Sequence, residues 1–151
     1  MPSKIPGAFS AVVSMFRAGL PNLTVIAGPG ATDMADTSYV LVGVADPDES
    51  TYADAVTGSQ QWAQLGGKFR DEHFSIHCVA VAWNGDSDSV KALTDVFAIV
   101  DAAGNALVAD PTLGGALLYA VGLTSIRVRL GQDANGAYAH LPFDVECRTR
   151  I

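Results

Sequence analysis

The chain has 151 residues, 49% of them apolar, which is enough for one compact domain with a substantial core and too few for two. Sixteen acidic and nine basic residues give a net charge of −7, which excludes a basic nucleic-acid-binding domain, because such domains neutralise phosphates with clustered Lys and Arg. The apolar stretches are interrupted before the roughly 18 residues that a membrane span requires, and the N-terminus lacks a signal-peptide core, so we expect synthesis in the cytoplasm and no membrane partner.

The first predicted element is a helix over residues 6–18. Pro6 fits the first turn of a helix, and Gly19 and Pro21 follow the end of the segment. Apolar side chains recur at helical spacing along one stripe: Phe9, Val12, Val13, Phe16 and Leu20. This spacing is typical of a helix that packs one face on a core.

Two short strands are predicted next, over residues 24–27 and 39–44. The second is almost continuously apolar, as expected for a strand covered on much of both faces. Residues 46–67 then break the pattern: they begin acidic and become polar, with Tyr52 and Trp62 far from any apolar run. We interpret this segment as a long loop with, at most, a short extended piece near Trp62. A compact domain seldom keeps so long a loop without a use for it.

The longest strand signal covers residues 68–83 and is rich in aromatic and β-branched side chains. A turn follows, and Asp88 or the serine before it can cap the next helix. The helical spacing extends over residues 88–105, and Gly104 is expected to weaken or stop this helix. Its apolar stripe contains six side chains: Val90, Leu93, Val96, Phe97, Val100 and Leu107.

The last third of the chain predicts a β-hairpin. Apolar and polar residues alternate over residues 124–131 and 139–148, on either side of Asn135-Gly136, a pair that suits a type I′ turn. With that turn, three pairs of residues lie opposite each other: Val128 and Phe143, Ile126 and Val145, Arg127 and Asp144. One face of the hairpin is then buried, and the other presents charged side chains: Arg127, Arg129, Asp144, Glu146 and Arg148. We expect that second face to be solvated or to form an assembly surface.

Together these elements predict an α+β fold in a single domain over residues 1–151. The expected architecture is one mostly antiparallel sheet of about five strands, with both helices packed on one face and the hairpin at the C-terminus. The charged hairpin residues then fall on the sheet face that no helix covers.

The sequence offers poor candidates for catalysis or cofactor binding. Residues 28–31 lack the Lys-Ser/Thr of a phosphate-binding loop, and the acidic segment from residue 46 lacks the Gly and Glu of a calcium loop. His73 and His77, four apart on a strand, lie roughly 13 Å from each other, too far to chelate one metal ion. No Gly-x-Ser-x-Gly motif occurs. We therefore expect no enzyme activity, no cofactor and no metal site.

The two cysteines, Cys78 and Cys147, lie inside strand-like apolar runs. Free cysteine is among the most buried residue types, so a pair of reduced core thiols is the simplest interpretation. A disulfide needs oxidising conditions and a geometry that the sequence does not define.

Two segments carry a resemblance to a known family. Residues 110–115 (DPTLGG) join an amphipathic helix to a strand, and the chain ends on a strand with the weave FDVECRTRI over residues 143–151. Together with the opening helix and the long strand before the second helix, they resemble the tail terminator proteins of siphophages of actinobacteria. The likeness follows the order of elements over nearly the whole chain.

The resemblance implies the small α+β domain of lambda-like tail terminators, which act as a structural ring. Such a protein assembles with itself, as a hexamer, on the last ring of the major tail tube protein in the neck of the virion. There it stops tube polymerisation and offers a joining surface to the head–tail connector. DNA passes through the lumen without sequence-specific binding, which an acidic lumen would favour by repulsion. On this basis we expect protein-interface roles for seven residues: Tyr52, Trp62, Arg127, Arg129, Asp144, Glu146 and Arg148.

Two other interpretations remain open from the sequence. The chain fits another structural component, either a head-closure or adaptor protein of the neck or a tail tube subunit, although two clear helices disfavour a tube subunit. A small enzyme or ligand-binding domain that uses the acidic loop is the alternative from a different class. A defined ring favours the terminator, whereas metal-dependent stabilisation of a monomer favours the ligand-binding domain.

Overall fold

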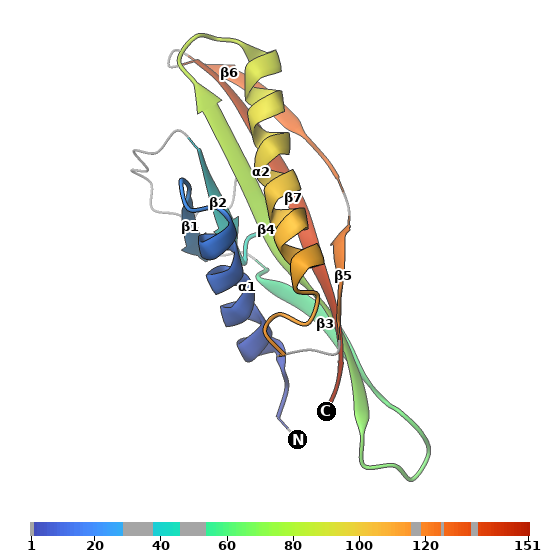
Figure 1. Cartoon of the computed structure of the whole chain (residues 1–151). Helices are drawn as coiled ribbons and strands as arrows, with labels where there is room; N and C mark the ends of the chain where they lie inside the picture. The colour runs from blue at the N-terminus through green and yellow to red at the C-terminus, as the bar shows by residue number, and fades with distance from the viewer. Residues whose placement is uncertain (1, 29–37, 46–53, 116–118, 125, 134–135) are drawn as a thin grey trace.

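The computed structural model describes residues 2–28, 38–45, 54–115, 119–124, 126–133 and 136–151, with the backbone alone over 119–124. One sheet of seven strands carries two helices on one face, so the fold class is α+β, as predicted (Figure 1). The sheet is elongated, because its two central strands, β4 (Arg70–Asn84) and β7 (Gly136–Arg150), have 15 residues each and pair along almost their whole length.

The strand order is β1–β2–β4–β7–β5, with β1 at Thr24–Ala27, β2 at Ser38–Val42 and β5 at Tyr119–Thr124. Two further strands extend the central pair: β3 (Val56–Trp62) pairs with β4 beyond β2, and β6 (Arg129–Asp133) pairs with β7 beyond β5. Within the part of the chain that the structure describes, only β1 and β2 pair in parallel. The sheet is therefore mostly antiparallel, as predicted, with seven strands in place of about five.

The main core lies between the sheet and the helices. Toward the helices, β4 presents Phe74, Ile76 and Cys78, and β7 presents Leu141 and Phe143. All five side chains are buried. Successive side chains on a strand point to opposite faces, so the inward alternation predicted for β7 is confirmed.

Helix α1 (Ile5–Gly19) packs on this core through the predicted stripe. Val12 and Phe16 are buried, and Phe9 is partly buried against the same cluster. The centroid of the Phe16 ring lies 6.2 Å from that of Phe143 on β7. Full burial of a Phe side chain contributes roughly 1.5–3 kcal/mol, so this contact is a main link between α1 and the sheet.

Helix α2 (Ser89–Ala109) begins as predicted after Asp88, whose Oδ1 accepts a hydrogen bond from the Lys91 backbone N–H at 3.1 Å. It does not stop near Gly104, because Leu107 and its neighbours still pack on the core. Val90, predicted for the buried stripe, is instead 73% exposed. By length and composition α2 could cross a membrane, but core helices meet the same criteria and α2 packs along the sheet.

The predicted loop over residues 46–67 is wrong in its second half. Residues 56–62 form β3, which pairs with β4 from Val56↔Ile76 to Trp62↔Arg70. The segment Thr-Gly-Ser-Gln-Gln carries no apolar alternation, because both faces of β3 beyond Val56 are exposed. Cross-strand hydrogen bonding, and not burial, holds this strand in place. Residues 46–53, with Tyr52, lie outside the described residues.

The predicted register of the C-terminal hairpin is also wrong. In β6 it is off by two residues, since Asp133 pairs with Gly136 and Leu130 with Ala139. At Asp144, whose partner on this side is Thr124 of β5 and not Arg127, it is off by three. A shift by two keeps each side chain on its face, since the side-chain period of a strand is two. Gly136, predicted as part of the Asn-Gly turn, is instead the first residue of β7 and pairs with Asp133, while residues 134–135 lie outside the described residues.

The first strand of that hairpin is less buried than its alternation suggests. Ile126 is 68% exposed and Leu130 is 50% exposed, whereas Val128 is partly buried against the core. Residues 126–128 belong to no strand. The alternation over residues 124–131, which predicted one continuous strand, therefore covers the end of β5 and the start of β6. Alternation alone cannot show such an interruption.

Candidate assembly surfaces

The most prominent surface feature is the hairpin of β3 and the first half of β4, residues 56–76, which we call the arm. Figure 1 shows the arm extending past both helices at the lower end of the molecule. Its end, residues 62–70, is the tip. The tip is closed by hydrogen bonds from the Ala63 N–H to the Phe69 carbonyl and from the Gly67 N–H to the Gln64 carbonyl, both 3.1 Å.

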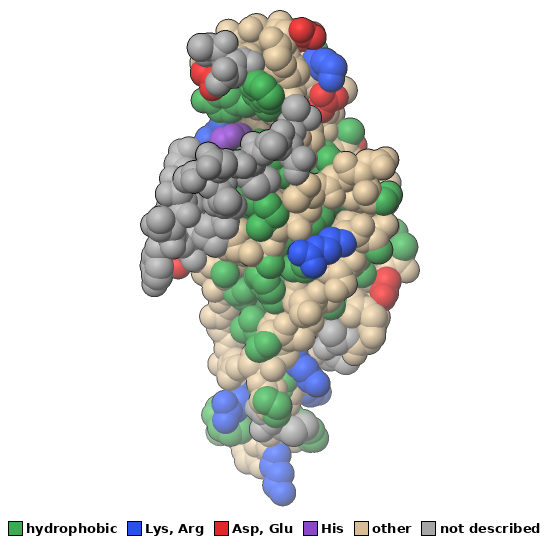
Figure 2. All heavy atoms as spheres, turned by 90° about the vertical axis from the view of Figure 1, so that its left-hand side faces the viewer, with side chains coloured by type: hydrophobic (Ala, Val, Ile, Leu, Met, Phe, Trp, Pro, Cys, Tyr) green, Lys and Arg blue, Asp and Glu red, His purple; other side chains and the backbone are tan. Residues whose placement is uncertain are grey.

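The tip combines exposed apolar side chains with positive charge. Trp62 is 63% exposed, Phe69 is 53% exposed, and Leu65 has no shielding from its own chain at all. The Arg70 guanidinium lies over the Trp62 ring, 4.7 Å from its centroid. Figure 2 shows hydrophobic and basic side chains gathered at this lower end, whereas acidic ones are prominent at the upper end. Aromatic residues and Arg are enriched in protein interfaces, so the tip has the composition of a contact site.

A buried carboxylate anchors the arm just behind its tip. Glu72 of β4 is 1% exposed. Its carboxylate accepts hydrogen bonds from the Ser3 hydroxyl at 2.7 Å, the Lys4 backbone N–H at 2.9 Å and the Gln60 side-chain amide at 2.6 Å. Burial raises the pKa of Glu72, but these three hydrogen bonds outweigh it and hold the pKa below its usual value. The charged side chain thus joins α1, β3 and β4.

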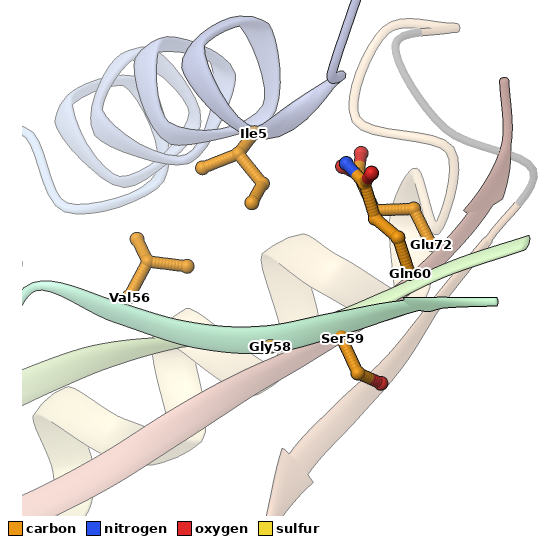
Figure 3. Close-up of a pocket in the computed structure, with 6 residues that line it drawn as sticks. All are labelled: Ile5, Val56, Gly58, Ser59, Gln60 and Glu72. Carbon is orange, nitrogen blue, oxygen red and sulfur yellow. The ribbon is translucent and has the colours of Figure 1, made fainter.

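A pocket of about 510 Å³ opens in the corner between the start of α1 and β3 (Figure 3). Ile5 and Val56 form its apolar side, while Gln60 and Glu72 form a polar side on which their side chains meet. Gly58 lies on β3 between Val56 and Gln60 and also lines the pocket. A Cβ at Gly58 would meet the backbone of β4, so glycine is needed for the close pairing of the two strands.

The outer face of the sheet, which points away from the helices, holds three of the predicted interface residues on β7. Asp144 Oδ1 lies 2.6 Å from His77 Nδ1 of β4, and Arg148 lies 3.8 Å from Glu146. Arg129 of β6 lies opposite His140 of β7 and is partly buried. Arg127 is exposed and lies outside any strand. The structure therefore brings Asp144, Glu146 and Arg148 onto one face, without placing Arg127 beside them.

His77 also approaches Thr57 of β3, with 3.0 Å between Nε2 and the threonine Oγ1. The order Thr57–His77–Asp144 is that of a nucleophile, base and acid, which the sequence did not reveal because the three residues come from three strands. The adjacent hollow, which Thr57 and Glu146 help to line, measures only about 150 Å³. Ligand pockets are typically about 300–1,000 Å³, so the arrangement is better suited to linking three strands than to holding a substrate.

The remaining titratable groups form no further site. In the portion described, no group of three or more His, Cys, Asp and Glu residues is placed to hold a metal ion. Cys78 and Cys147 are free and buried, as predicted. Burial raises the pKa of both thiols, to about 12 for Cys147 and higher still for Cys78, so neither is a reactive thiolate.

Comparisons with known proteins identify no family. No family model matches the chain, and no curated protein matches it. One similar chain of known structure comes from a virion of a native gene transfer agent (GTA) particle, with 15% identity, a TM-score of 0.43 and 93% of each chain covered. Similarity at this level establishes neither a shared family nor a shared function.

Proposed function

We propose that this protein is a structural subunit of a phage virion, and specifically a tail terminator that forms a ring on the end of the tail tube. In that position it stops tube polymerisation and provides the surface to which the head–tail connector joins. The observation that carries the proposal is the arm, whose tip exposes three large apolar side chains, Trp62, Leu65 and Phe69. It is consistent with the resemblance of residues 110–115 and 143–151 to tail terminators.

The energetics of the tip favour a role in assembly. An exposed apolar side chain contributes nothing to the stability of its own chain, whereas its burial in an interface contributes roughly 1.5–3 kcal/mol for residues the size of Leu or Phe. The Glu72 hydrogen bonds hold the arm just behind its tip, so we expect little conformational entropy to be lost when the tip docks. A rigid arm with an apolar end is a device for contact with a neighbour.

The charged residues of the outer face take a secondary part in this proposal. Asp144, Glu146 and Arg148 would meet neighbouring subunits in the ring, together with Arg129 and the exposed Arg127. Trp62 would act as an aromatic anchor, and Tyr52 would contribute from the preceding segment. The net charge of −7 would help DNA to pass through the ring by like-charge repulsion.

A small enzyme is the less favoured candidate, although the Thr57–His77–Asp144 arrangement is the specific observation that supports it. A neck adaptor or a tube subunit would use the same arm with a different partner. These structural roles differ in outcome: a tube subunit polymerises without limit, whereas a terminator forms one ring and ends growth.

The test is a capping assay with polymerising tail tubes. Tube lengths, measured by electron microscopy, should become limited when the protein is added, and the protein should be visible as a ring at one tube end. Replacing residues 63–69 with Asn-Gly joins Trp62 to Arg70 by a two-residue turn and removes most of the tip. This variant should stay folded and fail to cap. Normal capping by it would contradict the role of the tip, and a Val90→Ser variant, altered at another exposed apolar residue, serves as control.

A further inference from the structure

We infer that the pocket at Ile5, Val56, Gly58, Ser59, Gln60 and Glu72 receives the arm tip of a second copy of this chain, with Leu65 as the inserted side chain. The inference rests on the proposed self-association and identifies the two surfaces that meet. It follows from three properties of the pocket and the tip: their polarity, their charge and their position along the molecule.

The polarity of the two surfaces matches. One side of the pocket is apolar, at Ile5 and Val56, and its volume of about 510 Å³ leaves room for a large side chain. Leu65 is fully exposed in its own chain and Phe69 half exposed. An apolar anchor that fills a preformed pocket is the usual centre of a strong protein interface.

Their charges are complementary. Between Trp62 and Arg70 the tip carries two basic residues, Lys68 and Arg70, and no acidic one. The pocket contains the carboxylate of Glu72, whose pKa lies below its usual value because of its hydrogen bonds to Ser3, Lys4 and Gln60, which outweigh burial. A basic tip is therefore attracted to a pocket that carries a negative charge at neutral pH.

The position of the two surfaces favours a lateral contact between two copies. Trp62 lies four residues beyond Gly58 on β3, about 13 Å at the rise of a strand, and Leu65 lies further away still. Arg70 of the tip donates a hydrogen bond to Gln60 of its own pocket at 3.4 Å, but Leu65 is fully exposed and does not occupy that pocket. The offset is small beside the roughly 50 Å length of β4, so two docked copies that point the same way overlap along most of their length and lie side by side. Side-by-side, head-to-tail contacts are those that can close into a ring.

Cysteine cross-linking between two differently tagged chains tests the contact. One chain carries Leu65→Cys and the other Ile5→Cys, and the native Cys78 and Cys147 are buried and do not compete. Mild oxidation of the mixture should give a disulfide-linked pair of the two chains. Val90→Cys, which is 73% exposed on α2, should cross-link to Ile5→Cys at least about ten-fold less, since disulfides need close Cβ atoms. Equal linking at both positions, or none at either, overturns the inference.

A second variant pair keeps the test independent of cross-linking chemistry. Leu65→Asp changes a fully exposed side chain, so the thermal unfolding midpoint should be unchanged while the assembled species dissociates in sedimentation. Val90→Asp should leave assembly intact, and unchanged assembly of Leu65→Asp overturns the inference. A ring without the Leu65–Ile5 cross-link refutes this contact and leaves the terminator role standing. Cross-linked closed dimers without a ring support the contact and refute the terminator role.

Discussion

The carboxylate of Glu72 on β4 accepts a hydrogen bond from the Lys4 backbone N–H at 2.9 Å, and so caps the start of α1 from a position 68 residues away. Lys4 provides no side-chain cap of its own, and the first turn of α1 contains no acidic residue. A negative charge at a helix N-terminus also interacts favourably with the helix dipole. One buried side chain therefore links the start of the first helix to the arm just behind its tip.

Replacing Glu72 with Gln should lower the free energy of unfolding by about 2 kcal/mol at neutral pH, because the amide cannot accept all three hydrogen bonds and leaves a buried donor unsatisfied. The lowered pKa of Glu72 determines how this effect depends on pH. A carboxyl whose pKa falls on folding stabilises the native state above its unfolded pKa and loses that contribution as the pH falls through the folded pKa.

The stability difference between the native protein and Glu72→Gln should therefore shrink below about pH 4, near the ordinary pKa of a glutamate. Urea denaturation at neutral pH and in acid measures it. A difference that stays constant through the acid range would show that the charge of Glu72 is unimportant. Ser3→Ala, which removes one of the three donors and keeps the carboxylate, is the matched control.

The sequence predicts the parts of this fold that are buried. The stripe of α1 and the inward residues of β7 follow from periodicity, because burial selects apolar side chains at 3.6- and 2-residue spacing. Strand β3 could not be found in this way, since beyond Val56 it is exposed and is held by its pairing with β4. The sequence predicts an interface role for Trp62, but the position of Trp62 on the arm depends on the pairing of β3 with β4.

The partners of the charged residues on the outer face could not be predicted from the sequence for a different reason. A two-residue turn at Asn135-Gly136 predicts that Asp144 faces Arg127. The true partner, His77, is opposite Asp144 in the β4–β7 ladder, which is a pairing between strands 67 residues apart. Local pattern fixes which face a residue occupies, whereas long-range register fixes what it touches.

A double-mutant cycle on His77 and Asp144 should give a coupling energy of about 0.5–1 kcal/mol, the upper part of the range for partly exposed pairs. A second cycle, on Thr57 and His77, should also show coupling, because the Thr57 hydroxyl lies 3.0 Å from the Nε2 atom of His77. Glu146 and Arg148, at 3.8 Å on the same face, provide the comparison and should show a smaller coupling. Equal coupling for both pairs would contradict a specific link through His77.

Neither native thiol should react with a disulfide reagent such as Ellman's reagent while the chain is folded. Cys78 and Cys147 are buried, and burial raises the pKa of each, so almost no thiolate is present at neutral pH. Both should react at once in urea, and in native buffer their slow modification should follow the unfolding rate. Fast modification of one thiol under native conditions would show that its strand opens locally.

Gly136 is required at the start of β7, whereas Gly7 in α1 is not required by its surroundings. Its φ of 133° is unfavourable for other residues, and an added Cβ would collide with the Asn84 carbonyl at the corner between β4 and α2. We therefore expect Gly136→Ala to destabilise the fold by about 1–3 kcal/mol. Gly7 in α1 has open space at its Cβ position, so Gly7→Ala should stabilise the helix by about 0.5–1 kcal/mol. Thermal unfolding of the two variants measures both changes, and a stable Gly136→Ala would mean that β7 does not approach Asn84 so closely.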